Sequence, residues 1–124
     1  MVHTTVDPER GLVVIEPDGP LRQEDFERLR DQLAPVVSQG RLRGVVLRAA
    51  NFPGWSDFDA FAAHVAFVKD HQRNVQRVAV VSDSPLLKAL PAFARVLISP
   101  EIRHFDAADF EAAERWAATG EATA

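Results

Sequence analysis

Short apolar runs alternate along the chain with stretches in which apolar residues recur every three or four positions. Runs of the first kind are typical of buried strands, and the second spacing is typical of amphipathic helices. The pattern predicts strands and helices in the order ββαβαβαβα. The predicted strands cover residues 1–6, 12–16, 44–48, 78–81 and 101–105.

The first two predicted helices each carry an apolar stripe. The first begins near Arg22, and Pro35 should end or kink it, because proline removes a helical hydrogen bond. The second begins with Ser56 as its N-cap and runs to about Gln72. The stripe of the first helix consists of Phe26, Leu29, Leu33 and Val36 or Val37. The predicted inward side chains of the second are Phe58, Phe61, Ala62, Val65 and Val68.

Two further helices are predicted in the second half of the chain. The third covers residues 86–97, and we expect Pro91 to split or bend it. The fourth opens with Asp106 as its N-cap and ends near Trp116. The tail over residues 119–124 is expected to fray.

Alternating strands and helices indicate an α/β fold with a mixed, mostly parallel sheet of four to five strands flanked by four helices. The 124 residues fit one domain, and no linker or repeat divides them. Residues 44–48 form an unbroken aliphatic run, as expected of a strand covered on both faces. We therefore expect a single domain over residues 1–124.

Charge and cysteine content exclude several classes of function. The formal net charge is -4 and the basic residues are scattered, whereas nucleic-acid binding requires a concentrated basic face. There are no cysteines, so disulfides and zinc–thiolate sites are excluded. No stretch approaches the roughly 20 apolar residues of a membrane span. These features predict a cytoplasmic protein without an integral membrane segment.

Several short segments, taken in order, carry a family resemblance from about Gly11 to Trp116. The segments are Gly19-Pro20-Leu21, Gly44–Leu47, Trp55-Ser56-Asp57, Phe67–His71, Arg77–Val81 and Glu101–Phe105 with Trp116. Together they resemble the SpoIIAA-like family, which comprises small bacterial domains related to the STAS anti-sigma-factor antagonists. The family has also been likened to the Sec14 lipid-binding fold. The resemblance implies a mixed sheet flanked by helices, and it implies no known activity.

The resemblance also draws attention to Ser56. Classical STAS regulators carry an Asp-Ser pair at the start of the second helix, where a partner kinase phosphorylates the serine. Here the corresponding region reads Phe-Pro-Gly-Trp-Ser-Asp over residues 52–57, without the Asp-Ser-Ser-Gly type of pattern. Ser56 is therefore the candidate phosphorylation site that the resemblance implies.

The loop over residues 49–55 is the strongest candidate binding element. Ligands of α/β sheets tend to sit beyond the carboxyl ends of parallel strands, and this loop leaves such an end. It carries Phe52 and Trp55, which are unusually large and apolar for a solvated connection. They are interpreted as the wall of an apolar pocket or as a docking surface, or alternatively as a cap on the core.

The second helix carries Asp57, His64 and His71 at heptad spacing, roughly along one face. Histidines seven residues apart lie about 10 Å apart along a helix, so one metal ion cannot bridge them. We therefore expect no metal site here. His64 is expected to be partly buried, and His71 to interact with the helix C-terminus.

The third helix is apolar around much of its circumference and includes Leu90 and Phe93. A helix of this kind is either deeply buried or covered by something else. A homodimer contact, a hydrophobic ligand, or a bend at Pro91 that turns both sides inward would each explain the pattern.

No catalytic constellation is visible. The Gly-x-Ser-x-Gly elbow of serine hydrolases and the glycine-rich nucleotide loops are absent. The Ser82-Asp83-Ser84 turn could hold an anion at the start of the third helix, but Asp83 would repel it, and helix capping by Ser84 explains the turn.

These observations predict a non-enzymatic interaction or regulatory module that acts through protein–protein contacts, with a homodimer expected and no cofactor. The alternative is a binder of a small apolar ligand, such as an acyl chain, in a pocket under the loop over residues 49–55. The candidate binding residues are Phe52, Trp55, Ser56, Asp57, Phe61, His64, Leu90 and Phe93.

Overall fold

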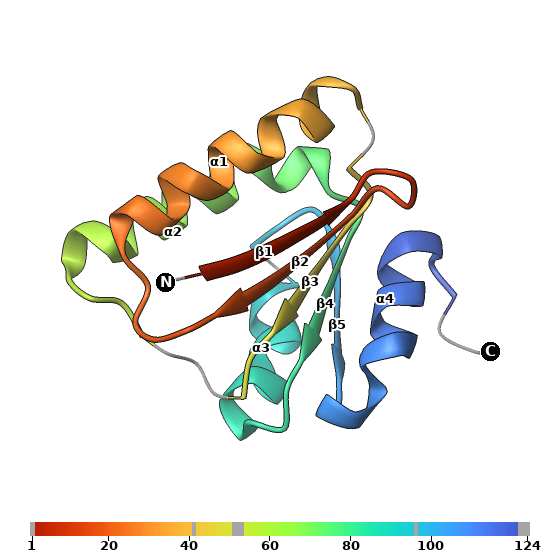
Figure 1. Cartoon of the computed structure of the whole chain (residues 1–124). Helices are drawn as coiled ribbons and strands as arrows, with labels where there is room; N and C mark the ends of the chain where they lie inside the picture. The colour runs from red at the N-terminus through yellow and green to blue at the C-terminus, as the bar shows by residue number, and fades with distance from the viewer. Residues whose placement is uncertain (1, 41, 51–53, 96, 122–124) are drawn as a thin grey trace.

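Five strands form one sheet in the order β1-β2-β3-β4-β5 (Figure 1). The computed structural model describes residues 2–40, 42–50, 54–95 and 97–121. The first strand pairs antiparallel with the second, and the other three pairs are parallel. This confirms the predicted mixed, mostly parallel sheet. The strands are β1 (Val2–Asp7), β2 (Leu12–Pro17), β3 (Gly44–Arg48), β4 (Arg77–Val81) and β5 (Glu101–Phe105).

Four α-helices flank the sheet, as predicted. Each parallel strand pair is joined through a helix, and right-handed crossovers in a sheet of this order place all three such helices on one face. The fourth helix covers the opposite face (Figure 1). The helices are α1 (Gln23–Ser38), α2 (Phe58–His71), α3 (Pro85–Ala94) and α4 (Phe110–Thr119). The short 3₁₀ turns are η1 (Gln72–Asn74) and η2 (Ala107–Asp109).

Alternation along the strands divides the core into two apolar clusters, one on each face of the sheet. One joins β2 and β3 to the stripe of α1, including Val13, Val45 and Leu33. The other packs the opposite side of the same strands against Ala117 and neighbouring residues of α4. Because both faces are covered, β2 and β3 carry the continuous aliphatic runs that mark buried strands.

The close docking of α4 depends on a glycine in β3. A Cβ atom added at Gly44 would lie 2.2 Å from the carbonyl oxygen of Ala117. The Arg77 side chain then donates to the carbonyl oxygens of Ala117 and Ala118 at 3.1 and 3.3 Å. A cationic donor at the last carbonyls of a helix satisfies groups that the helix itself leaves unpaired.

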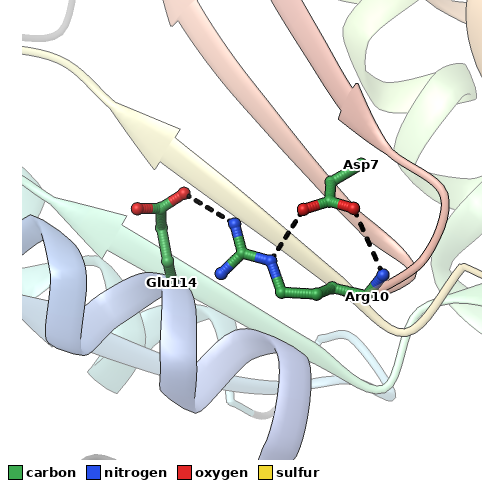
Figure 2. Close-up of polar contacts among 3 residues, drawn as sticks. All are labelled: Asp7, Arg10 and Glu114. Carbon is green, nitrogen blue, oxygen red and sulfur yellow. Dashed lines mark hydrogen bonds and ion pairs between the residues drawn. The ribbon is translucent and has the colours of Figure 1, made fainter.

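Ion pairs also join the β1–β2 turn to α4 (Figure 2). The Arg10 side chain donates to Asp7 at 2.7 Å and to Glu114 at 3.3 Å. The hydrogen bond from Arg10 lowers the pKa of the Asp7 carboxyl. Exposed pairs of this kind contribute little to stability because solvent screens them, so they orient the turn more than they stabilise the fold.

Several helix ends differ from the prediction. The first helix continues past Pro35 to Ser38, and α3 runs unbroken through Pro91 to Ala94. Pro91 is buried, and its packing offsets part of the hydrogen bond that proline removes. Asp106 precedes the η2 turn, and α4 itself starts at Phe110 and extends through Thr119.

The single domain and the fraying of residues 119–124 stay predictions. Gly120 ends α4 in a left-handed conformation, while residues 122–124 lie outside the described ranges. None of the described helices is both long and apolar enough to cross a bilayer.

Candidate functional site

The candidate site lies where the chain enters α2, beyond the carboxyl end of β3. Here the backbone around Trp55 runs beside the end of the β2–α1 connection. The Leu21 N–H donates to the Gly54 carbonyl, and the Ser56 N–H donates to the Leu21 carbonyl, both at 2.8 Å. Since Leu21 is itself buried, these two bonds fix the position of Trp55 relative to the core. The backbone turns into this bridge at Gly54, whose φ of 76° favours glycine.

The N-cap of α2 is Asp57, which corrects the predicted Ser56. One Asp57 carboxylate oxygen accepts a hydrogen bond from the Ala60 N–H at 2.9 Å. A carboxylate at this position satisfies an unpaired N–H and favours the helix dipole. The Ser56 backbone N–H is already held by Leu21, so Ser56 lies one residue before the cap with an exposed side chain.

Trp55 and His64 are joined by a side-chain hydrogen bond. The Trp55 indole Nε1–H donates to His64 Nδ1 at 3.1 Å. This bond requires a neutral imidazole with its proton on Nε2. The His64 ring also stacks on Phe26 of α1, with ring centroids 4.9 Å apart. Burial in this setting lowers the pKa of His64, which favours the same neutral form.

The rotation of α2 differs from the prediction. Ala60, Ala63 and Phe67 face inward with His64 and His71, and Ala60 has no exposed surface. The side chains of Phe58, Phe61, Ala62 and Val65 point outward instead, and Val68 is half-buried. Both faces of this helix are apolar, so periodicity alone could not tell which one packs on α1. The bridge at Trp55 and the stacking of His64 on Phe26 determine the rotation.

The outward face therefore carries a continuous apolar surface, here called the aromatic stripe, made of Trp55, Phe58, Phe61 and Val65. Their exposed fractions are 36%, 75%, 39% and 53%. Trp55 and Phe61 meet edge to face with centroids 4.8 Å apart, and Phe58 and Phe61 lie 6.0 Å apart. The stripe brings together two of the predicted binding residues, Trp55 and Phe61, with two residues that the prediction had placed in the core.

The two histidines of α2 are held by packing and hydrogen bonds within the domain. The His71 ring stacks on Phe67 at 4.2 Å, and its Nδ1 lies 2.9 Å from the Phe67 carbonyl oxygen. Asp57 is occupied as the N-cap. Within the described ranges, no group of three or more potential metal ligands is close enough to hold an ion.

A family model described as SpoIIAA-like matches residues 12–118, from the start of β2 to the last turn of α4. The chain belongs to the SpoIIAA-like family. An uncharacterized protein from Shewanella loihica PV-4 with a SpoIIAA-like fold superposes on it with a TM-score of 0.78. The sequences are 17% identical, and the match covers 94% of this chain and 93% of the other. No curated protein matches the sequence significantly.

Of the remaining predicted residues of this SpoIIAA-like domain, Leu90 does not join the aromatic stripe. Leu90 is half-buried on α3, which packs chiefly against β5. Phe52 and the Phe93 side chain lie outside what the structure describes. On and after α3, Leu86 and Leu97 are 62% and 76% exposed. The third helix thus carries an exposed apolar residue in Leu86, and Leu97 lies three residues beyond its end.

The serine turn after β4 has a structural role in this domain. Ser82 is fully buried, and its hydroxyl donates to the Ala50 carbonyl and accepts from the Ser84 N–H. Asp83 accepts a hydrogen bond from the Ala107 N–H at 3.0 Å. These bonds join the loops that follow β3, β4 and β5 at the carboxyl end of the sheet. Ser84 occupies the predicted N-cap position, although its side chain makes no capping hydrogen bond.

Two surface hollows among the described residues lie away from Trp55. The larger, of about 490 Å³, is lined by Arg48 and the start of α4, where the guanidinium sits 4.0 Å from the Phe110 ring centroid. The smaller, of about 220 Å³, lies beside the β1–β2 turn. The sequence had no signal for the larger hollow, because Arg48 and Phe110 come together only when α4 packs back over β3 and β4.

Proposed function

We propose that this SpoIIAA-like domain is a non-enzymatic interaction module that binds a protein partner through the aromatic stripe. One observation carries the proposal: α2 is apolar on two opposite faces, and its own chain covers only one of them. A helix that is apolar nearly all round is normally covered on both sides. Large exposed apolar surfaces on small domains mark interaction sites.

The chemistry of the stripe supports a protein partner. Tryptophan and phenylalanine are enriched in interface centres, where a few aromatic anchors supply most of the binding energy. Trp55 is held by the Leu21 bridge and by His64, so little side-chain freedom remains to be lost on binding. An anchor fixed before association loses less entropy when the complex forms.

Membership of the SpoIIAA-like family supports a regulatory role without catalysis in general terms. The described site agrees with that proposal, because His64 and Asp57 are engaged by Trp55 and by the helix start. A cytoplasmic location stays a prediction of the sequence.

Cross-linking mass spectrometry in a lysate of the native host tests the proposal. We expect cross-links from Lys69, at the far end of α2, to another protein chain. These should be lost in Phe58→Asp and kept in Leu97→Asp, a matched control at an equally exposed apolar position outside α2. An identical set of cross-links in both variants would count against the stripe.

The alternative function is the binding of a small apolar ligand under the loop over residues 49–55. The edge-to-face pair of Trp55 and Phe61 would suit an acyl chain, whereas the two hollows described above lie elsewhere. A native mass spectrum of protein from its host separates the two functions. Extra mass that is lost on denaturation and reduced in Trp55→Ala would favour the ligand.

Ser56 is the proposed point of regulation. Its side chain is exposed beside Trp55, so a kinase can reach it without unfolding α2. A phosphoryl group would add about -1.5 to -2 charges at the edge of an apolar surface. We expect a phosphoryl mass in the denatured spectrum of host-purified protein and none in Ser56→Ala. Equal phosphorylation of both chains would place the modification elsewhere.

A further inference from the structure

We infer that the occupant of the aromatic stripe is a second copy of this chain, docked α2 against α2 in an antiparallel, two-fold symmetric pair. This inference rests on the proposed function and names its partner. It comes from the pattern of charge along the exposed face of α2, which is complementary to itself only in that orientation.

The two ends of the exposed face carry opposite charge. Asp57 and Asp59 lie at the start of α2, and Lys69 lies in its last turn on the same side as Phe58 and Val65. Among the described residues, Asp59 and Lys69 make no ion pair, whereas the neighbouring Asp70 pairs with Arg30 of α1 at 3.8 Å. Asp59 and Lys69 are therefore available to pair with charges of another chain.

The spacing fits an antiparallel pair centred at the level of Ala63. Lys69 and Asp57 lie six residues on either side of that midpoint, about 9 Å away along the axis at 1.5 Å per residue. Reversing a second α2 about the midpoint places Lys69 of each copy level with the acidic start of the other. The same operation brings Phe61 of one copy level with Val65 of the other. A parallel arrangement would instead place like charges together, which is unfavourable.

The small residues of this face allow the helices to approach. Ala62 and Ala66 are exposed between and beside the large side chains of the stripe. Large side chains from the partner can pack over such positions, as in ordinary helix–helix contacts. A two-fold pair repeats every contact twice, so a short helix can supply two copies of each aromatic and ionic contact.

Size indicates that the dimer is weak. A helix of 14 residues is about 21 Å long, and contacts limited to such helices fall at the low end of specific interfaces. We expect a dissociation constant on the order of 10 µM. At that affinity, another protein could displace the second copy from the aromatic stripe.

Sedimentation velocity of the full chain, from about 1 to about 500 µM, tests the dimer. We expect a shift from monomer to dimer for the wild type and for Leu97→Asp, and a monomer throughout for Phe58→Asp and Val65→Asp. Far-ultraviolet circular dichroism checks that each variant is folded. Leu86→Asp examines α3, because loss of the dimer there together with its persistence in Phe58→Asp would move the contact to α3 and overturn the inference.

A charge-swap experiment tests the orientation. Lys69→Glu and Asp59→Lys should each weaken self-association about tenfold, since each substitution replaces two exposed ion pairs by two contacts between like charges. Asp59 is chosen because Asp57 is needed as the N-cap. An equimolar mixture should recover near wild-type affinity as a heterodimer with both pairs restored. Failure to recover overturns the antiparallel register.

The outcomes separate this inference from the proposed function. A wild type that stays monomeric at the highest concentration overturns the second copy as occupant. If Phe58→Asp still abolishes cross-links to a different protein in that case, the proposed function stands without the dimer. If neither a dimer nor such cross-links depend on Phe58, both fail.

Discussion

His64 couples the pH of the solution to the residue that anchors the stripe. Its Nδ1 accepts from the Trp55 indole, and its ring is stacked between α1 and α2. Protonation would place a second N–H where the indole already donates, and it would charge a ring that is half-buried. Both effects oppose the charged form, and they act together on a single side chain.

We expect the free energy of unfolding to fall in acid because of His64. Burial lowers the pKa of His64 in the folded protein, while in the unfolded chain it stays near about 6.5. The stabilisation is therefore complete above that pH and is lost as the pH falls below it, where the unfolded chain takes up the proton first. Urea titrations at pH 7.5 and pH 5 measure the change.

The control for this experiment is His64→Gln, whose amide oxygen can still accept from Trp55. The other histidines are unchanged in this variant, so the difference between the two pH dependences isolates His64. A wild type and a variant with equal dependence on pH would show that the protonation of His64 does not oppose folding.

The stability of two variants at the start of α2 tests which residue caps the helix. Asp57→Ala should lower the free energy of unfolding by about 1 kcal/mol, because the Ala60 N–H loses its acceptor. Ser56→Ala should change it by less than about 0.5 kcal/mol, since the side chain is exposed and caps nothing. Denaturant midpoints of the two variants decide the matter, and the opposite order would restore Ser56 as the cap.

At the scale of elements, the strands and the helix order were predictable and the rotation of α2 was not. The predicted strands over residues 44–48 and 101–105 match β3 and β5 at both ends. The first segment is an aliphatic run too short for a helix, and the second lies between Pro100 and Asp106, which bound it. In α2, apolar residues lie on two faces, and the choice between them depends on Leu21 and Phe26, which are distant in sequence.

The candidate site was predictable to a similar degree. Trp55 was identified because large aromatic residues are unusual in a loop at the carboxyl end of a strand, and His64 because of its spacing on the second helix. Phe58 and Val65 were missed as surface residues, because the pattern assigned them to the core. Leu90 was predicted to be a binding residue, but it does not lie at this site, because α3 packs chiefly on β5.

A comparison of two phenylalanines on α2 measures the rotation directly. Phe67 packs against the cluster under α1, whereas Phe58 is 75% exposed. Phe67→Ala should lower the free energy of unfolding by about 3 kcal/mol, and Phe58→Ala by less than about 0.5 kcal/mol at low protein concentration. The reverse order in urea denaturation would mean that the helix is rotated as the sequence pattern predicted.

At the scale of the whole molecule, the two faces of the sheet are covered unequally. Three helices lie on one face and α4 alone on the other (Figure 1), where Gly44, Arg77 and the ion pairs of Arg10 hold it (Figure 2). The side with three helices also carries the aromatic stripe. The docking of α4 and the proposed association therefore involve opposite sides of the sheet, and changes on the stripe should leave the docking of α4 intact.

This separation predicts how thermal stability depends on concentration. If only the folded chain dimerises, association adds to the free energy of unfolding by mass action, about 1.6 kcal/mol when the total concentration is a hundredfold above the dissociation constant. For a domain of this size, that gain corresponds to a rise in Tm of roughly 5 °C. Calorimetry of the wild type at increasing concentration should show the rise, whereas Phe58→Asp should unfold at one temperature throughout. A concentration-dependent Tm that survives in Phe58→Asp would mean that the folded chain associates through another surface, because the side of the sheet that bears α4 is unchanged in that variant.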